Sequence, residues 1–457
     1  MPTFTVVHER KDLTITPGDY YAFIQSAAEE SVTLELIDAD HSLLDNSKSS
    51  VAWRSDLREL WALAFAARRT ENRIHVAERL AAQMHEFTST FISLSDETTS
   101  PFTWQEWHEA GTWLMLRSVD ATSSSVAIET IHPVSPPQQS LLKRIFSMAD
   151  WPSASAAEIT SALKQIDPFG ACLVLDVGQA SANAFISQDG YPTFYFDAGA
   201  PLSRNTATAH TYCTHQDPLI ILSHWHKDHW GGEQHNQELL TQTWIAPRQD
   251  IGLHQSQFAT RILAAGGSLL IMKRSVTGRR SLTYNQHQVD LLLEYCTGPS
   301  GSLNNSGLAL QISWPQDDEY WRFEGDEHWL FPGDADYRYV PQRMSTHNDP
   351  TLLVASHHGA APQRRTTAPS PGPNAANRRL IYSYGAGNTY SHPTQRAKDA
   401  HQNAGWAYPQ TGYWGADVRA TVGSATHGRC SIAVGVGGTR PPTQHLTGPD
   451  HQLTIRQ

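Results

Sequence analysis

Apolar residues recur at helical spacing between residues 54 and 86, with charged residues at the positions between them. This periodicity predicts one long helix or two. The runs TLELIDA near residue 33 and SSVAIETI near residue 124 are typical of strands, whereas SPPQQS and WPSASA are typical of loops. We therefore expect residues 1–165 to form an accessory α+β domain.

The pattern then changes to short apolar runs separated by Gly and Pro turns. The runs ACLVLDV, ANAFISQ and TFYFDAG predict three antiparallel strands. A buried run, Leu219–Leu222, follows them, and EQHNQELLTQ after it is helical in pattern. Further strands are expected at VDLLLEY, SGLALQISW, HWLFPGD, TLLVASHHG and RLIYSYG, and further helices at QSQFATRILAA and PTQRAKDAHQNA. This alternation favours an α/β domain over residues 166–440, with sheets between helices, and leaves 441–457 as a polar tail.

Composition agrees with a folded protein of more than one domain. The chain has 457 residues, which is more than one hydrophobic core usually serves, and 39% of them are hydrophobic. The N-terminal MPTFTVVHERKDLTI is too charged for a signal peptide, and no apolar run approaches the ~20 residues of a membrane span. The expected location is the cytoplasm, without a membrane partner. The four cysteines match no zinc-ribbon spacing and are expected to be buried free thiols: Cys172, Cys213, Cys296 and Cys430.

The formal charge of −11 argues against a protein that coats nucleic acid non-specifically, because such binding needs many Lys and Arg contacts to phosphate. It does not exclude a nuclease, since divalent cations would offset negative charge inside a site. Local basic pairs such as Arg364-Arg365 could be a phosphate track or a solvated surface.

The strongest chemical signal is the run His224-Trp225-His226-Lys227-Asp228-His229 at the end of the apolar run 219–222. Four possible metal ligands within six residues are hard to explain by packing. His224 and His226, two residues apart, could point the same way and hold one ion, while Asp228 and His229 reach a second. Gly231-Gly232 then allows a sharp turn.

The pattern H-x-H-x-D-H after a buried strand resembles the signature of the metallo-β-lactamase fold. Further segments resemble, in their order, the nuclease domain of the ComEC-type competence proteins: Leu175-Asp176-Val177-Gly178-Gln179, Asn304-Asn305-Ser306, Pro332-Gly333-Asp334, Ser356-His357-His358-Gly359 and Asn388-Thr389-Tyr390-Ser391-His392-Pro393. The resemblance covers roughly residues 169–425. It implies an αββα sandwich that holds two divalent metal ions.

The resemblance also implies roles for single residues. Asp334 would bridge both ions, and His357 or His358 would complete the second site. Asp176 resembles an acidic residue that supports the metal-binding histidines, although it could equally cap a turn. His392 stands before a helix opened by Pro393, where it could meet a phosphate or simply be an exposed loop histidine.

Two positions depart from the ComEC pattern. Ala180-Ser181 stands where Gly-Asp usually follows Val-Gly-Gln, and Ala360 stands where a serine commonly follows His-His-Gly. No clear third histidine for the first ion lies between His229 and Asp334. A water molecule or one of four side chains could fill that place: His235, His254, His287 or Asn305.

These features predict a metal-dependent hydrolase that uses a metal-activated water. Asp228 would orient the water, and His392 would stabilise or protonate the departing oxygen. Zinc suits the ligands, and manganese is the alternative. The leading substrate is a DNA or RNA phosphodiester. The alternatives are a small substrate (a lactone, thioester, cyclic nucleotide or choline phosphoester) or a binding module with a relic site, and no oligomeric state is indicated.

Overall fold

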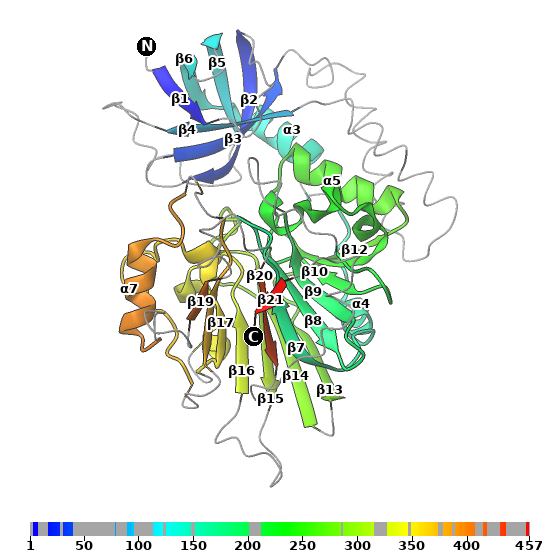
Figure 1. The fold of residues 1–457 in the computed structure, drawn as a ribbon. Helices are drawn as coiled ribbons and strands as arrows, with labels where there is room; N and C mark the ends of the chain where they lie inside the picture. Colours follow the sequence, from blue (N-terminus) through cyan, green and yellow to red (C-terminus); the bar gives the residue numbers. More distant parts are fainter. Residues whose placement is uncertain are drawn as a thin grey trace. The chain divides into compact units, whose positions relative to one another are not determined.

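A computed structural model gives the fold of the chain (Figure 1). It describes residues 3–7, 17–27, 31–39, 78, 89–95, 113–121, 125–146, 148, 151–200, 212–284, 287–314, 327–345, 349–372, 378–385, 388, 390–406, 415–417, 430–435 and 454–456. The chain forms two compact units. The first comprises Met1–Pro152, Gln249–Leu269 and Pro299–Leu303, and the second comprises Ser153–Arg248, Leu270–Gly298 and Asn304–Gln457.

These units are not consecutive halves of the sequence. Two segments beyond residue 165 belong to the first unit, and helix α4 (Ala156–Leu163) belongs to the second. Within the expected tail, β21 (Thr454–Arg456) pairs in parallel with β20 (Cys430–Gly435). The domain limits 1–165, 166–440 and 441–457 stay a prediction.

The first unit contains a closed antiparallel barrel, coloured blue to cyan in Figure 1. The strands follow one another around it in the order β1 (Thr3–Val7), β4 (Ser89–Ser95), β3 (Ser31–Asp38), β2 (Gly18–Ala27), β5 (Trp113–Ala121) and β6 (Ser125–Pro133). Closure leaves no free sheet edge. The Trp113 ring contacts Phe23 and Phe146, with centroids 5.0 and 5.7 Å apart, so the first helix after the barrel packs onto a barrel aromatic.

Helices α3 (Pro136–Phe146) and α5 (Leu253–Ala264) also belong to the first unit. The stretch SPPQQS, predicted as a loop, instead opens α3, because proline lacks an N–H that the first turn of a helix does not need. The side chain of Gln138 accepts the backbone N–H of Ser135 and caps this end. The helices predicted over 54–86 lie outside the described residues apart from Glu78, which is helical.

The second unit contains two sheets. In the first, the order is β12 (Ser268–Met272), β11 (Thr243–Pro247), β10 (Leu219–Ile221), β9 (Pro192–Ala198), β8 (Ala182–Ser187), β7 (Phe169–Val174), β20 and β21. In the second, it is β13 (Gly278–Tyr284), β14 (His287–Tyr295), β15 (Leu308–Trp314), β16 (Glu327–Phe331), β17 (Leu352–Val354), β18 (Arg379–Tyr382) and β19 (Gly415–Asp417). The predicted meander is confirmed, since β7, β8 and β9 are antiparallel neighbours. The predicted α/β character of this part is also confirmed.

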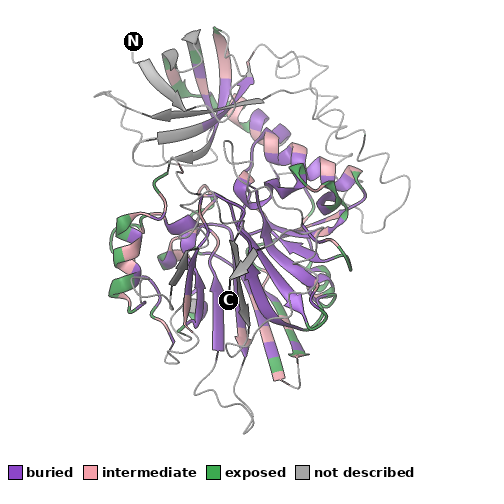
Figure 2. Cartoon of the chain, viewed as in Figure 1, coloured by how far each residue is buried: buried purple, intermediate pink, exposed green. Residues whose placement is uncertain are grey.

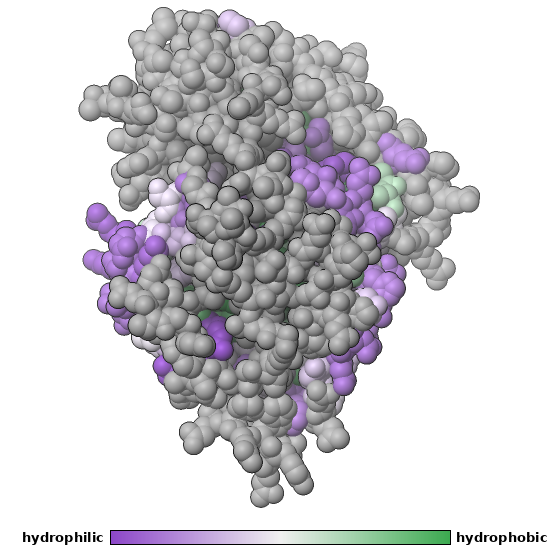
Figure 3. Space-filling view, in the orientation of Figure 1, coloured by the Kyte–Doolittle hydropathy of each residue, from purple (hydrophilic) through white to green (hydrophobic). Residues whose placement is uncertain are grey.

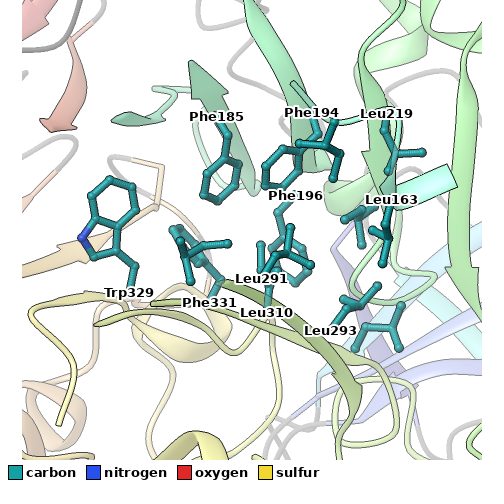
Figure 4. Close-up of a cluster of buried hydrophobic side chains, with 14 of the residues drawn as sticks. Leu163, Phe185, Phe194, Phe196, Leu219, Leu291, Leu293, Leu310, Trp329 and Phe331 are labelled. Atoms are coloured by element: carbon teal, nitrogen blue, oxygen red, sulfur yellow. The ribbon is translucent and has the colours of Figure 1, made fainter. Parts of the chain in front are cut away.

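One apolar cluster takes side chains from both sheets (Figure 4). Phe185 and Phe194 of the first sheet stack with centroids 4.0 Å apart, and Phe331 of the second sheet meets the edge of Phe185 at 5.1 Å. Every position of β7, β8 and β9 is buried. Strands buried on both faces read as continuous apolar runs, which is how these three appear in the sequence.

The second sheet is covered on its other face as well. Along β16, Trp329 and Phe331 belong to the shared cluster, whereas Leu330 between them belongs to a separate cluster with Leu353 and Leu380. Successive side chains of a strand point to opposite faces, so this alternation places one cluster on each side of the sheet. Figure 2 shows β15, β16 and β17 of this sheet as mainly buried and α7 (Gln395–Asn403) as largely exposed.

Three further features bear on the predictions. The helix expected at EQHNQELLTQ is replaced by two 3-10 turns, η6 (Gly231–Gln234) and η7 (Gln237–Thr241), separated where Asn236 caps the second. Cys172, Cys213 and Cys296 are buried free thiols, as expected. Within the described ranges, no helix combines the length and apolarity that crossing a bilayer demands, and the described surface visible in Figure 3 is mainly hydrophilic.

Candidate metal centre

The predicted ligands follow the carboxyl ends of neighbouring strands. Parallel strands β16, β17 and β18 lead into Asp334, His357-His358 and Ser383 respectively. In the other sheet, β9 carries Asp197 near its end, and its parallel neighbour β10 leads into His224. Since parallel strands end at the same edge of a sheet, residues far apart in sequence gather there.

Two glycines let these segments approach closely. Gly333 has φ of +59°, and a Cβ there would lie 2.8 Å from Cβ of Ser223. A Cβ on Gly199 would lie only 1.7 Å from the carbonyl oxygen of Asp228. A larger residue at either position would push apart the strand ends that carry the ligands.

Three residues of the site hold a left-handed backbone that disfavours side chains. They are Asp197 (φ 64°), His357 (φ 48°) and His358 (φ 55°). Such conformations cost about 1–3 kcal/mol each and persist where the surroundings impose them, often at functional sites. The left-handed backbone at two consecutive histidines therefore costs conformational free energy, which the surrounding contacts must offset.

Two groups of side chains bring ligand atoms within 4.8 Å of one another: His224, His229 and Asp334, and Asp228, His229 and His358. In the first, Oδ1 of Asp334 lies 3.1 Å from Nε2 of His229, and its Oδ2 lies 3.5 Å from Nε2 of His224. In the second, Nε2 of His358 lies 3.2 Å from Oδ2 of Asp228. His229 belongs to both, so the groups adjoin.

The donor set fits metal ions. Nε2 of His224 and Nε2 of His229 are buried and have no hydrogen-bond partner among the described residues. Leaving a buried polar atom unpaired costs about 1–3 kcal/mol, which a metal bond would offset. Ligand atoms 2.0–2.2 Å from one tetrahedral zinc lie about 3.3–3.6 Å apart. The separations of 3.1 and 3.5 Å to Asp334 are near that range, without the angles of a hydrogen bond.

The charge of the cluster also calls for cations. Asp197, Asp334 and Asp228 are only 0%, 4% and 8% exposed. Burial opposes the charge of Asp334, but His229 and His357 outweigh it and hold the pKa of this carboxyl low. Burial likewise opposes the charge of His229, yet Asp334 and Asp197 raise its pKa above the ordinary value. Positive charge must enter this site, as protons or as metal.

Hydrogen bonds from outside the cluster fix how the histidines face it. Nδ1 of His229 donates to Oδ2 of Asp197 at 2.7 Å, which leaves Nε2 to face Asp334. Oδ1 of Asp197 accepts the backbone N–H of Ser223 at 2.7 Å. Nδ1 of His358 donates to the carbonyl of Ser383 at 2.7 Å, so its Nε2 faces Asp228. Metal-binding histidines typically have such partners.

Asp197 and Ser383 are the supporting residues that the sequence interpretation missed. Asp176, proposed there for this supporting role, accepts the backbone N–H of Gly178 at 3.4 Å, which is the turn-capping alternative. A signal for Asp197 is present in the sequence, because it is the one charged residue of the predicted strand TFYFDAG and lies two positions before Gly199. Ser383 acts through its carbonyl, which no sequence pattern reveals.

The remaining predicted residues surround the two groups. The rings of His224 and His226 are 4.6 Å apart, and His226 is half-buried. Nε2 of His357 lies 3.6 Å from Oδ2 of Asp334, on a side chain that is 38% exposed. Nδ1 of His392 lies 3.2 Å from Nε2 of Gln179, and burial together with His357 lowers the pKa of His392 to about 3.

The three histidines proposed for the first ion's third position are absent from both groups: His235, His254 and His287. Asn305 uses its side-chain oxygen to accept the backbone N–H of Asp336 at 2.9 Å. His229 stands beside His224 instead, with ring centroids 4.1 Å apart. The 3-10 turn η5 (Lys227–His229) brings it back over the strand end.

A buried network supports the histidine turn. His401 of α7 lies between two tyrosines, with Nε2 2.7 Å from the hydroxyl of Tyr337 and Nδ1 2.7 Å from the hydroxyl of Tyr382. The Tyr337 hydroxyl also accepts the backbone N–H of Ser356 at 3.1 Å. This chain ties the segment after Asp334 to the residue that precedes His357.

No protein-family model matches the sequence, and no curated protein matches it. Among solved structures, the chain is similar to a long form RNase Z from yeast, with 10% sequence identity and a TM-score of 0.25. The match covers 61% of this chain and 46% of that one, so the chain spans less than half of that protein. A likeness of this size carries no argument about fold or activity.

Proposed function

We propose that residues 166–440 form a metallo-β-lactamase-like αββα hydrolase domain that uses two divalent ions to cleave phosphodiester bonds in DNA or RNA. The observation that carries this proposal is the pair of adjoining ligand groups that share His229, with buried Nε2 atoms left without hydrogen-bond partners. The motif resemblance to the ComEC-type nucleases supports the choice of reaction.

His224, His229 and Asp334 would hold one ion, and Asp228 with His358 would hold the other, Asp334 reaching both. His226 and His357 stand beside these groups and would complete them. Zinc suits this mixture of imidazole and carboxylate ligands, and manganese is the alternative. Divalent ions bound there would lower the pKa of a coordinated water and stabilise negative charge on the oxygens of the attacked phosphate.

The protein's own groups would orient the reactants. The carboxylate of Asp228, buried and beside His358, can accept a hydrogen bond from the attacking water and so direct its lone pair. Asp197 and the Ser383 carbonyl hold two histidines in the tautomer that presents Nε2. Each of these two hydrogen bonds orders a histidine side chain before metal binds, so less conformational entropy is lost on binding.

His392 is suited to donate a hydrogen bond rather than a proton. Oε1 of Gln179 accepts the N–H of Gly385 at 3.1 Å, which turns the amide Nε2 toward Nδ1 of His392. The amide donates, so Nδ1 accepts and the ring hydrogen is on Nε2. A neutral His392 would then stabilise a phosphate or departing oxygen with that N–H.

A phosphodiester fits the charge of this region. Three carboxylates and two divalent ions leave a formal charge near +1, which favours an anionic substrate over a neutral lactone. Arg364 and Arg365 are exposed in the loop after the histidines. Asp336 anchors that loop by accepting the N–H of Gln363 at 2.7 Å and the hydroxyl of Thr366 at 2.6 Å. The segment that carries these two arginines is thus anchored to a residue two positions after Asp334, which would favour contact with phosphate.

The test is hydrolysis by purified protein that has been stripped of metal and reloaded with zinc or manganese. Substrates are labelled single-stranded DNA, duplex DNA, RNA and a generic phosphodiester, together with a lactone and a thioester. Asp334→Asn, which keeps size and removes the shared carboxylate charge, is the inactive control. Metal-dependent cleavage of a nucleic acid that Asp334→Asn abolishes is the expected result. Turnover of only the lactone or thioester would contradict the nuclease proposal and show that the protein acts on small substrates.

A further inference from the structure

We infer that Tyr390 and His392 form a stacking platform for a nucleobase of the substrate, immediately outside the metal centre. This inference rests on the proposed function, because it takes as substrate a nucleic acid, which carries a planar base next to the scissile phosphate. It assigns a substrate contact to Tyr390, which takes no part in metal binding.

The two rings are arranged as a platform. Tyr390 is 41% exposed and is the exposed large hydrophobic side chain among the described residues. Its ring stacks on His392 with centroids 5.7 Å apart and an interplanar angle of 29°. A partly exposed aromatic ring of this kind is the feature on which proteins stack unpaired bases.

The platform leads directly to the ligands. The His392 ring lies 5.5 Å from the His357 ring, which it meets at 75°, and Nε2 of His357 lies 3.6 Å from Asp334. Three rings therefore run from the shared carboxylate to the surface. A phosphate at the metal centre would place the base of an adjoining nucleotide beside the outermost ring.

The backbone of His392 is held in place before any substrate binds. Asn388 accepts the backbone N–H of His392 at 2.9 Å and donates to the carbonyls of His392 and Gly385, both at 2.7 Å. Gln179 holds the ring itself. A preformed platform avoids the entropic cost of ordering a loop on binding.

The recognition would be tolerant of sequence, since every base has a π-face. It would also require an unpaired base, because a base inside a duplex is already stacked on its neighbours. The platform therefore points to single-stranded nucleic acid as the substrate class.

The experiment compares two single-stranded oligonucleotides of the same length, one with all its bases and one with abasic residues through its central segment. We measure kcat/KM for each with the metal-loaded wild type, Tyr390→Ala and Tyr390→Phe, and binding of each by fluorescence anisotropy with Asp228→Asn as background. Tyr191→Ala is the matched control, since Tyr191 also contacts a histidine ring, that of His215 at 4.6 Å, but lies in the turn before the opposite end of β9.

The wild type should prefer the intact oligonucleotide by roughly 5- to 150-fold, the range that stacking of one base supplies. Tyr390→Ala should lose that preference, whereas Tyr390→Phe and Tyr191→Ala should keep it. Equal loss on both oligonucleotides, or no loss, would overturn the platform while leaving the nuclease assignment intact. If the wild type cleaves neither, the proposed function fails, and the anisotropy preference still decides for or against the platform.

Discussion

Asp197→Asn should weaken metal binding although Asp197 is not a member of either ligand group. The native carboxylate accepts three hydrogens, from the backbone and hydroxyl of Ser223 and from Nδ1 of His229. Asparagine keeps one oxygen for the Ser223 N–H and places an NH2 group against His229. The imidazole must then accept at Nδ1, so its hydrogen moves to Nε2, the atom that should face the metal.

The size of the effect follows from the partners that are lost. A charge-assisted hydrogen bond that fixes a ligand tautomer contributes about 10- to 100-fold to metal affinity. At ~1.4 kcal/mol per tenfold, this is about 1.4–2.8 kcal/mol. Because His229 would hold one ion together with His224 and Asp334, the affinity for that ion should fall. The variant should therefore release this ion more readily, whereas the ion held by Asp228 and His358 should be affected less.

Competition with a chromophoric chelator measures the two affinities, and elemental analysis of the dialysed protein gives the stoichiometry. Asp176→Asn is the control, since this buried carboxylate accepts the Gly178 N–H. It should leave the affinities unchanged. Zinc affinity within about twofold of wild type for Asp197→Asn, or a larger loss for Asp176→Asn, would refute the tautomer reasoning.

Three further predictions concern the same unit. Purified protein should carry close to two divalent ions per chain, and no uptake of zinc or manganese on elemental analysis would contradict the enzymatic assignment. Asp228→Asn should lower the phosphodiesterase rate by several orders of magnitude, at ~1.4 kcal/mol per tenfold, while changing the melting temperature little; retention of a tenth of the rate or more would place the chemistry elsewhere. Burial lowers the pKa of His401 from 6.5 to about 4, so the folded state binds fewer protons than the unfolded state. Its contribution, on the order of 3 kcal/mol, should be present above pH 6.5 and lost as pH falls toward about 4; urea titrations of metal-free wild type and His401→Gln that stay parallel over this range would disprove it.

Much of the second unit could be predicted because its strands have a recognisable sequence pattern. The continuous apolar runs of β7, β8 and β9 predict buried strands, and the histidine cluster follows a short strand, β10. The barrel was harder to predict. Closure depends on β1 pairing with both β4 and β6, contacts between segments far apart in sequence that local periodicity does not encode.

The ligand grouping depends on the same kind of distant contact. Spacing alone pairs His224 with His226, as successive outward residues of a strand. In the structure β10 ends at Ile221, and the 3-10 turn η5 brings His229 onto His224. Asp197 meets His229 across 32 residues of sequence. Such partners are visible only once the two sheets are assembled.

The dispersal of the site along the chain ties metal capture to the completion of folding. Its ligands and their supports come from strand ends between Asp197 and Ser383, and none of the described strands contributes a full set alone. An incomplete or misregistered chain would therefore have no place for the ions. Ions that bind only the finished fold stabilise it by mass action. Metal supply would thus select among finished chains. Chains that have bound metal would persist. Chains without metal, whose buried carboxylates lack a neutralising positive charge, would unfold first and be cleaved by proteases.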